Sequence, residues 1–219
     1  MRSAVALQFA AAPDYERPTD LGGDNIYNLS VVVSDGNSST QQAVTVVVNN
    51  MAGTSIEGSA KKDTIDPTRA YKGKVVTGEE DWIDGKAGND KLGGGDGNDT
   101  LIGGTGKDTL TGGNGSDEFR FVSGLGAGNR DRIVDFVHGQ DRIGLDDRVF
   151  KKLGVTVDAG EFWSKAGATK AHDKSDRLIY DSKSGKLYYD DDGKGGHAAV
   201  HFATLSTKLV LDASDFGIV

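Results

Sequence analysis

Five aspartates recur at intervals of nine residues, and turns rich in glycine precede most of them: Asp81, Asp90, Asp99, Asp108 and Asp117. Three consecutive units, which begin at Gly94, Gly103 and Gly112, share the pattern G-G-x-G-x-D-x-U-x, where U is a bulky apolar residue. Glycines permit turns with positive φ and let carbonyl oxygens converge on one point. Carbonyl and carboxylate oxygens together suit a hard cation, and a flexible loop favours calcium over magnesium. The spacing therefore predicts a series of calcium sites.

The same residues predict that the segment needs its ion in order to fold. Twelve glycines lie between Gly85 and Gly115, and glycine loses more backbone freedom on ordering than any other residue. Fixing nine backbone residues costs on the order of 9–18 kcal/mol, whereas the one bulky side chain per unit contributes only ~1.5–3 kcal/mol when buried. A flexible acidic linker would explain the composition, but it would not keep five aspartates in phase with an apolar residue two positions later.

The repeated nonapeptide resembles the calcium-binding repeats of the RTX (repeats-in-toxin, hemolysin-type) family. This resemblance implies an all-β fold, a right-handed parallel β-roll in which turns 18 residues apart stack on the same side. Asp90 and Asp108 would then share one site, and Asp99 and Asp117 another. In the family, backbone carbonyls of the stacked turns complete each calcium site.

Carried over to this chain, the first set of carbonyl ligands falls on Gly85, Ala87, Gly103 and Thr105 on one side of the roll and Gly94, Asp96, Gly112 and Asn114 on the other. The complementary positions are Gly88, Gly95, Gly97, Gly104, Gly106, Gly113 and Gly115. The turn that ends at Asp81 has almost no glycine. It either forms half of a calcium site or serves as an N-terminal cap of the solenoid, and both readings remain open. Asp135 and Asp141, with Asp131, either complete the last calcium shell or pair with neighbouring arginines.

Three other motifs resemble functional sites but depart from the patterns they would need. Gly104-Thr105-Gly106-Lys107 lacks the Ser or Thr of a phosphate loop, and Asp108 would repel a phosphate. His197 and His201 have zinc-protease spacing, but on a strand they would lie about 13 Å apart. Asp190–Gly195 begins like an EF-hand, although no glutamate closes the loop; a solvated turn or a weak additional calcium site both remain open. We expect no catalytic activity.

Composition limits the possible functions further. The chain has 219 residues, a formal net charge of −8 and no cysteine, which excludes disulfides and thiolate metal sites. Its negative charge argues against nucleic acid as a partner. It has no run of 18 apolar residues, so no membrane span is expected.

Residues 1–50 show alternating strand patterns at 26–33 and 43–48, which predict a β-hairpin. They resemble the last strands of a bacterial cadherin-like repeat, and a whole repeat needs about seven strands. We therefore expect an N-terminal β-sandwich fragment, with which the chain begins inside a domain of a longer protein. Asp14, Glu16 and Asp35 match positions that help to bind inter-domain calcium in such repeats, although exposed loop acids are the commoner explanation of such residues.

The expected organisation continues with a connector and degenerate N-terminal cap of the roll (residues 51–75), the calcium-binding β-roll (76–121) and a C-terminal region (122–219). In the last region, residues 177–181 and 186–190 predict a hairpin, and residues 145–153 a short helix. This region resembles the segment that caps β-rolls in serralysin-type proteases and many proteins secreted by type I exporters. The resemblance implies that the C-terminus, including residues 215–219, is read by an ATP-driven exporter; a final core strand is the alternative.

These patterns predict a calcium-dependent folding and secretion module of a large bacterial extracellular or cell-surface protein, with an adhesin as the favoured parent. Such an adhesin would carry a surface or glycan ligand. Two alternatives differ in class: the non-catalytic tail of a secreted hydrolase, such as a metalloprotease or lipase, and a carbohydrate-binding β-roll.

Overall fold

The computed structural model describes residues 26–34, 38–47 and 53–219, which belong to two compact units, 1–51 and 52–219. In the first unit, β1 (Ile26–Ser34) and β2 (Ser39–Val47) form an antiparallel hairpin with Ile26 opposite Val47 and Ser34 opposite Ser39. The hairpin predicted from the alternating sequence is therefore present. The acids Asp14, Glu16 and Asp35 lie outside the described residues.

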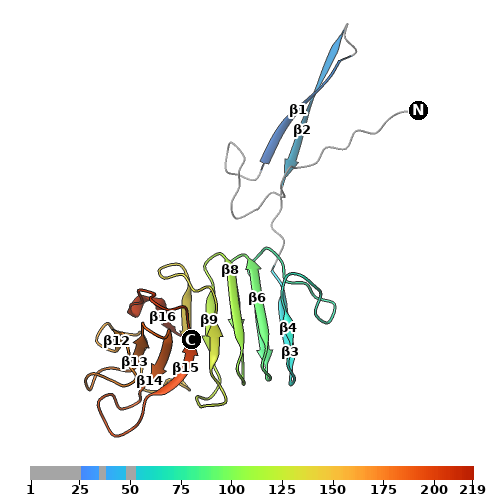
Figure 1. Ribbon diagram of the computed structural model, residues 1–219. Coiled ribbons are helices and arrows are strands. Elements are labelled where there is room, and N and C mark those ends of the chain that lie inside the picture. The colour runs from blue at the N-terminus through green and yellow to red at the C-terminus, as the bar shows by residue number, and fades with distance from the viewer. Residues whose placement is uncertain (1–25, 35–37, 48–52) are drawn as a thin grey trace. The chain divides into compact units, whose positions relative to one another are not determined.

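The second unit consists of two stacks of largely parallel strands, shown from edge to edge in Figure 1. The six-stranded sheet contains, in order, β16 (Phe216–Ile218), β11 (Arg142–Leu145), β9 (Glu118–Phe121), β7 (Thr100–Ile102), β5 (Trp82–Lys86) and β3 (Ser55–Ser59). The eight-stranded sheet contains β12 (Phe162–Lys165), β13 (Leu178–Asp181), β14 (Lys186–Tyr189), β15 (Val200–Thr204), β10 (Asp131–Ile133), β8 (Thr109–Asn114), β6 (Lys91–Asp96) and β4 (Thr64–Ile65).

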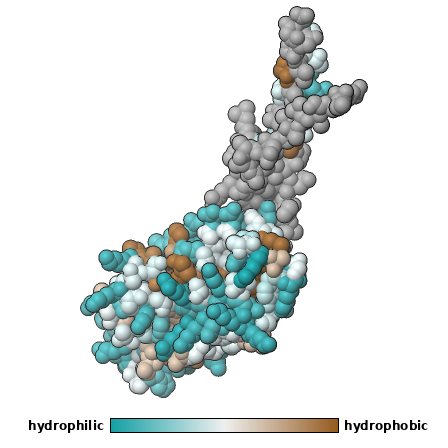
Figure 2. Space-filling view, turned by 45° about the vertical axis from the view of Figure 1, so that its right-hand side comes forward, coloured by the Kyte–Doolittle hydropathy of each residue, from teal (hydrophilic) through white to brown (hydrophobic). Residues whose placement is uncertain are grey.

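The nonapeptide period produces this arrangement because each unit supplies one turn and one short strand. Successive units alternate between the sheets, so strands 18 residues apart pair in parallel, with Leu92 beside Leu110 and Leu101 beside Phe119. These bulky residues are fully buried between the sheets, where they form the core. The visible surface of the unit is mostly hydrophilic with separate apolar patches (Figure 2). The predicted all-β fold, a parallel β-roll, is confirmed.

The roll begins earlier than residue 76, where the sequence placed its start. β3 and β4 form a first coil whose Ile56 and Ile65 are buried like the later apolar residues. They pair with β5 and β6 at a separation of 27 residues, since Ser55 lies beside Trp82 and Thr64 beside Lys91. The extra residues form the excursion 66–76. The segment expected to be a connector and degenerate N-terminal cap of the roll therefore supplies its first two strands.

The excursion 66–76 folds back on the first strand. The Lys72 ammonium donates to the carbonyls of Glu57 (3.2 Å) and Gly58 (2.8 Å), and that of Lys74 donates to the carbonyl of Ser55. Val76 is buried in the core. The excursion therefore provides hydrogen-bond donors for carbonyls of an edge strand.

The C-terminal region continues both sheets and closes the core with aromatic side chains. The predicted hairpin of β13 and β14 is antiparallel, and β15 joins it to β10. The Phe202 ring contacts the rings of Phe121 and Phe150 at centroid distances of 5.1 and 5.2 Å. These edge-to-face contacts stabilise the cap beyond simple burial.

The helix predicted over residues 145–153 is absent. β11 ends at Leu145, and a single turn follows in which the amide of Phe150 donates to the carbonyl of Asp146 (2.8 Å). Among the described residues the one helix is a short 3₁₀ turn at Ala213–Asp215. No helix in this part of the chain has the length and apolarity needed to span a membrane. The apolar C-terminus forms β16 beside β11, which matches the alternative of a final core strand.

Candidate metal centre

The repeat aspartates stack in two columns along the roll. In one column the Asp90 amide donates to Oδ1 of Asp108 (2.7 Å). In the other the Asp81 amide donates to Oδ1 of Asp99 (2.8 Å), and the Asp99 amide to Oδ1 of Asp117 (2.9 Å). Each bond joins turns 18 residues apart. The structure therefore brings together the pairs Asp90–Asp108 and Asp99–Asp117, which the resemblance to RTX repeats assigned to common sites.

The second oxygen of four of these carboxylates has no protein partner. Oδ2 of Asp90, Asp99, Asp108 and Asp117 is buried without a hydrogen bond, and each residue is only 1–2% exposed. Burying an ionised carboxylate without a partner costs several kcal/mol. The two such oxygens in each column fit a bound cation.

Glycine carbonyls face the same positions. A Cβ built on Gly85 would lie 2.6 Å from Oδ2 of Asp90 and 2.7 Å from the carbonyl oxygen of Gly103. A Cβ on Gly94 would meet Oδ2 of Asp99 and the Gly112 carbonyl oxygen, the latter at 2.7 Å. In each case a carboxylate oxygen and a carbonyl oxygen of the next coil converge on space that only glycine leaves open. This all-oxygen cradle suits calcium.

The raised pKa values of the aspartates show that the two columns disfavour ionised carboxylates when no cation is bound. Burial raises the pKa of Asp99 to about 7, against the lowering effect of the Asp81 amide, and repulsion from Asp117 adds to the increase. Burial likewise raises the pKa values of Asp90 and Asp117 to about 6. At neutral pH a divalent cation would offset both the desolvation and the repulsion.

The column continues beyond the repeats at Asp131, which follows the loop 122–130. Its Oδ1 accepts the Asp108 amide at 3.0 Å, and the residue is 5% exposed. Burial raises the pKa of Asp131 to about 8, and repulsion from Asp108 contributes. The loop therefore takes the place of a nonapeptide turn although it has a different sequence.

Three further aspartates predicted as ligands have protein donors for both oxygens. Asp81 accepts the amide of Thr77 at Oδ2 (2.6 Å) and its hydroxyl at Oδ1 (2.9 Å). Asp135 accepts the amides of Gly112 and Gly113. Asp141 accepts those of Asp117 (3.0 Å) and Val137 (2.8 Å). These three carboxylates bond to protein groups at the ends of the repeat array, and the arginine pairing considered for Asp135 and Asp141 is not among the ion pairs of the described residues.

The remaining predicted positions lie in stacked turns. Ala87 bridges Thr105 in parallel, and the amide of Gly88 donates to the Thr105 carbonyl (2.9 Å). Gly95 lies beside Gly113. Positive φ occurs at Gly88, Gly95, Gly97, Gly104, Gly106, Gly113 and Gly115. Asp96 and Asn114 also pair, but their exposed side chains bond to each other (2.7 Å).

Sequence reasoning missed a second ladder made by asparagines. Oδ1 of Asn89 accepts the Lys107 amide (2.8 Å), and Oδ1 of Asn98 accepts the Ser116 amide (2.7 Å). Oδ1 of Asn129 accepts the Gly106 amide (2.7 Å) in the same way. Asparagine directly before the repeat aspartate, at 89 and 98, was the signal in the sequence.

The histidine motif does not form one site. Nδ1 of His197 contacts Asp191 (2.8 Å), whereas Nε2 of His201 contacts the carbonyl oxygen of Ala203 (2.9 Å). Asp191, Asp192 and His197 place potential ligand atoms within 4.8 Å of one another on an exposed turn. The EF-hand-like segment forms a surface turn with internal hydrogen bonds, and a weak additional calcium site there stays a prediction.

Comparison with known proteins assigns the repeats. The model of the RTX calcium-binding nonapeptide repeat (4 copies) matches residues 77–104 and 93–124. No curated protein matches the chain.

The solved structures that are similar to the chain include the following two. The AlgE6R3 subunit of the Azotobacter vinelandii mannuronan C5-epimerase is 28% identical, over 78% of this chain and 85% of that one, with a TM-score of 0.44. The extracellular lipase LipA of Serratia marcescens is 18% identical, over 88% of this chain and 26% of that one, with a TM-score of 0.41. Residues 77–124 are RTX calcium-binding nonapeptide repeats, and calcium is the ion that their turns bind.

Proposed function

We propose that the chain is a calcium-dependent folding and secretion module of a large bacterial extracellular protein. The observation that carries this proposal is the set of four buried carboxylate oxygens without protein partners. A fold that leaves such groups unpaired is stable only when something outside the protein neutralises them. Calcium supplies that charge when it is bound.

The chain's own residues convert this requirement into a switch. The glycine turns cost backbone entropy, and the carboxylates of Asp90, Asp99, Asp108 and Asp117 repel one another when bare. Extracellular calcium modules bind at ~10⁻⁴–10⁻³ M, far above cytosolic calcium. Because calcium binds only the rolled state, its binding energy becomes folding energy outside the cell.

Secretion through a type I exporter requires an unfolded chain with a readable C-terminus. In the folded structure the C-terminal strand β16 pairs with β11. The buried side chain of Asp215 contacts His138, with 2.8 Å between Oδ1 and Nδ1. The proposed signal is therefore exposed only before the roll forms, which supports a requirement for low calcium during export.

An adhesin is the parent protein we favour, because the antiparallel hairpin of the first unit agrees with the cadherin-like reading of residues 1–50. The tail of a secreted hydrolase is the competing parent. The gene region upstream distinguishes them: further cadherin-like repeats support the adhesin, and a catalytic domain overturns it.

Circular dichroism during a calcium titration, with reversal by EDTA, tests the folding mechanism. Asp99→Ala should raise the calcium midpoint for β-structure, because Oδ2 of Asp99 faces the Gly112 carbonyl. Asp147→Ala, at an exposed position outside the columns, is the matched control. An unchanged midpoint for Asp99→Ala would contradict the mechanism.

A secretion assay with a type I exporter tests the proposed C-terminal secretion signal. Deletion of residues 215–219 should abolish release into the medium while the cells still synthesise the chain. His138→Ala removes the contact to Asp215 but keeps the C-terminal sequence, so it should be released normally. Normal release of the truncated chain would overturn the secretion signal and leave the calcium mechanism intact.

A further inference from the structure

The outward face of the eight-stranded sheet carries a row of basic side chains in register. Strand pairing places Lys91 beside Thr109, Thr109 beside Arg132, and Arg132 beside Thr204. Thr204 in turn lies beside Lys186. All three basic residues are exposed. Cations and threonine hydroxyls therefore alternate from strand to strand across β6, β8, β10, β15 and β14.

The spacing of this row is regular. Neighbouring strands lie about 4.8 Å apart, so basic residues on every second strand are separated by roughly 10 Å. Lys91, Arg132 and Lys186 thus form a line of charges that runs perpendicular to the strands. A long ligand with repeated negative charges could contact all three at once.

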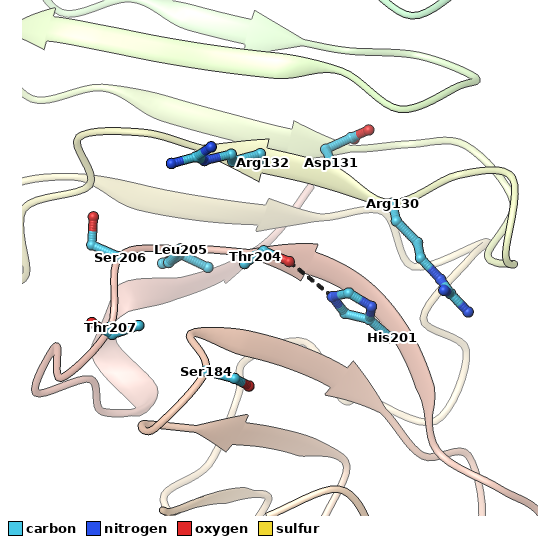
Figure 3. Close-up of a pocket in the computed structure, with 9 residues that line it drawn as sticks. All are labelled: Arg130, Asp131, Arg132, Ser184, His201, Thr204, Leu205, Ser206 and Thr207. Carbon is cyan, nitrogen blue, oxygen red and sulfur yellow. Dashed lines mark hydrogen bonds between the residues drawn. The ribbon is translucent and has the colours of Figure 1, made fainter. Parts of the chain in front are cut away.

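A hollow lies at the C-terminal half of this row. It has a volume of about 560 Å³ and is lined by β10, β15 and the β13–β14 turn. Arg132 of β10 and Arg130, directly before this strand, point in different directions, and Ser184, Ser206 and Thr207 lie across from them (Figure 3). The hollow therefore combines two guanidinium groups with several hydroxyls, which are donors for both acidic and neutral oxygens.

These cations make no direct salt bridge in the part of the chain that the structure describes. None of the ion pairs among residues 26–34, 38–47 and 53–219 includes Lys91, Arg130, Arg132 or Lys186. Burial lowers the pKa of His201, and the charges of Arg130 and Lys186 lower it further, which indicates a positive potential on this face. The chain as a whole carries a net charge of −8, so the positive charge here is a local feature.

Three acids lie near the row. The Thr68 hydroxyl lowers the pKa of Asp66, and the charges of Arg69 and Lys91 lower it further. Asp131 is 5% exposed and its Oδ1 accepts the Asp108 amide (3.0 Å) inside the turn column. Asp181, which pairs with Lys186 along the strands, accepts the Gly167 amide (2.6 Å) and the Ser184 hydroxyl (2.5 Å). Asp131 and Asp181 are therefore buried and bonded to protein donors, whereas the three basic residues of the row are exposed.

We propose that this face binds an acidic glycan, a hydroxyl-rich chain with repeated carboxylate or sulfate groups, across Lys91, Arg132 and Lys186. Arg130 and the hydroxyls of Ser206 and Thr207 contact the sugar units that lie in the hollow. This binding site lies on the sheet face and is separate from the calcium columns in the turns.

The observations favour a glycan over a nucleic acid. Non-specific binding of single-stranded nucleic acid relies on aromatic rings that stack with bases, and the residues lining the hollow include no tyrosine, tryptophan or phenylalanine. Alternating cations and hydroxyls instead match a ligand that alternates charge and hydroxyl groups.

Isothermal titration of the calcium-loaded chain tests the proposal with four probes of equal length. An oligogalacturonate carries carboxylates, a chondroitin sulfate oligosaccharide carries both groups, a malto-oligosaccharide is neutral, and an oligothymidylate carries phosphates. At least one acidic glycan should bind, with affinity that falls as salt rises. Binding of both acidic glycans would show that negative charge matters more than whether a carboxylate or a sulfate carries it. Binding of only one would identify which of these acidic groups the face recognises. Failure of both, or tighter binding of the oligothymidylate, would overturn the proposal.

The double substitution Arg132→Gln and Lys186→Gln should weaken glycan binding at least tenfold. Lys151→Gln with Lys152→Gln removes the same charge from exposed residues outside the row and should leave binding unchanged. Equal losses in both variants would show that only net charge matters, and would refute the assigned face. Calcium-dependent folding, followed by circular dichroism in the same samples, should be the same for both variants, so failure here is distinct from failure of the proposed function.

Discussion

Asp99→Asn should have opposite effects on the roll without and with calcium. Asparagine keeps an acceptor oxygen for the Asp81 amide, which now donates to Asp99 Oδ1 at 2.8 Å. It removes a charge that is 1% exposed and lies close to Asp117 and Asp81. The ion-free fold should therefore become more stable, although a hydrogen-bonded aspartate has been replaced.

The size of the effect follows from the pKa. The value of about 7 lies about three units above the ordinary 3.8, and each unit corresponds to about 1.4 kcal/mol. Above pH 7 the ionised group thus costs the ion-free fold at most about 4 kcal/mol. Solvent screening near the turns reduces this, so we expect Asp99→Asn to add about 2 kcal/mol.

With calcium bound, the effect of Asp99→Asn on stability has the opposite sign. Oδ2 of Asp99 is one of the four unpartnered oxygens, and an amide neither neutralises the ion nor matches its preference for carboxylate. The variant should therefore gain much less stability from calcium than the wild-type chain gains. In millimolar calcium it should be the less stable of the two.

Circular dichroism measures the stability of the fold both without calcium and with calcium. In EDTA, where the wild-type chain is expected to be unfolded, trimethylamine N-oxide is added until β-structure forms, because excluded osmolytes favour burial. The variant should fold at a lower osmolyte concentration. In calcium, urea unfolding should show it to be less stable, while Asp147→Asn should leave both measurements unchanged. If Asp99→Asn destabilises the ion-free roll as well, bare charge does not limit its folding.

Two further predictions concern the pH dependence of the fold and the room that glycine leaves in the calcium-binding turns. The pKa values of Asp90, Asp99 and Asp117 are raised in the fold, so the ion-free roll binds protons that the unfolded chain releases; it should gain stability as the pH falls from 8 to 5, and calcium affinity should fall over the same range. Osmolyte-induced folding and calcium titration at each pH check this, and greater ion-free stability at pH 8 would contradict it. Gly94→Ala should weaken calcium-induced folding strongly, because its Cβ would meet Oδ2 of Asp99, whereas Gly124→Ala, with open space around it, should not; equal calcium midpoints for the two would count against the cradle.

The repeat made most of the roll predictable because one residue type has one task at each position. Aspartate every nine residues gives two columns, and the apolar residue two positions later gives the core, as Leu101 and Phe119 show. The first coil was harder to predict. Its Asp63 accepts the amide and hydroxyl of Ser59 (2.6 and 2.8 Å), so this turn needs neither the glycines nor the spacing of its successors.

Other features depend on contacts distant in sequence. The helix expected at residues 145–153 is limited to one turn, since Phe150 packs on Tyr189 and Phe202 from the cap and fixes the local chain path. The roles of Asp81, Asp135 and Asp141 depend on which amides lie next to them, and no local pattern specifies that. The basic row on the sheet face arises from strand pairing between Arg132 and residues more than 50 positions away.

The hydrogen bonds from Lys72 and Lys74 to the carbonyls of β3 have a consequence for assembly and for evolution. A stack of parallel strands invites another chain to extend it, and occupied carbonyls with charged groups over them discourage such growth. Since each coil contacts only its neighbours, whole nonapeptide pairs could be gained or lost in the middle of the array without disturbing this terminus. The ion capacity of the module could therefore change by duplication while its tendency to polymerise stays low.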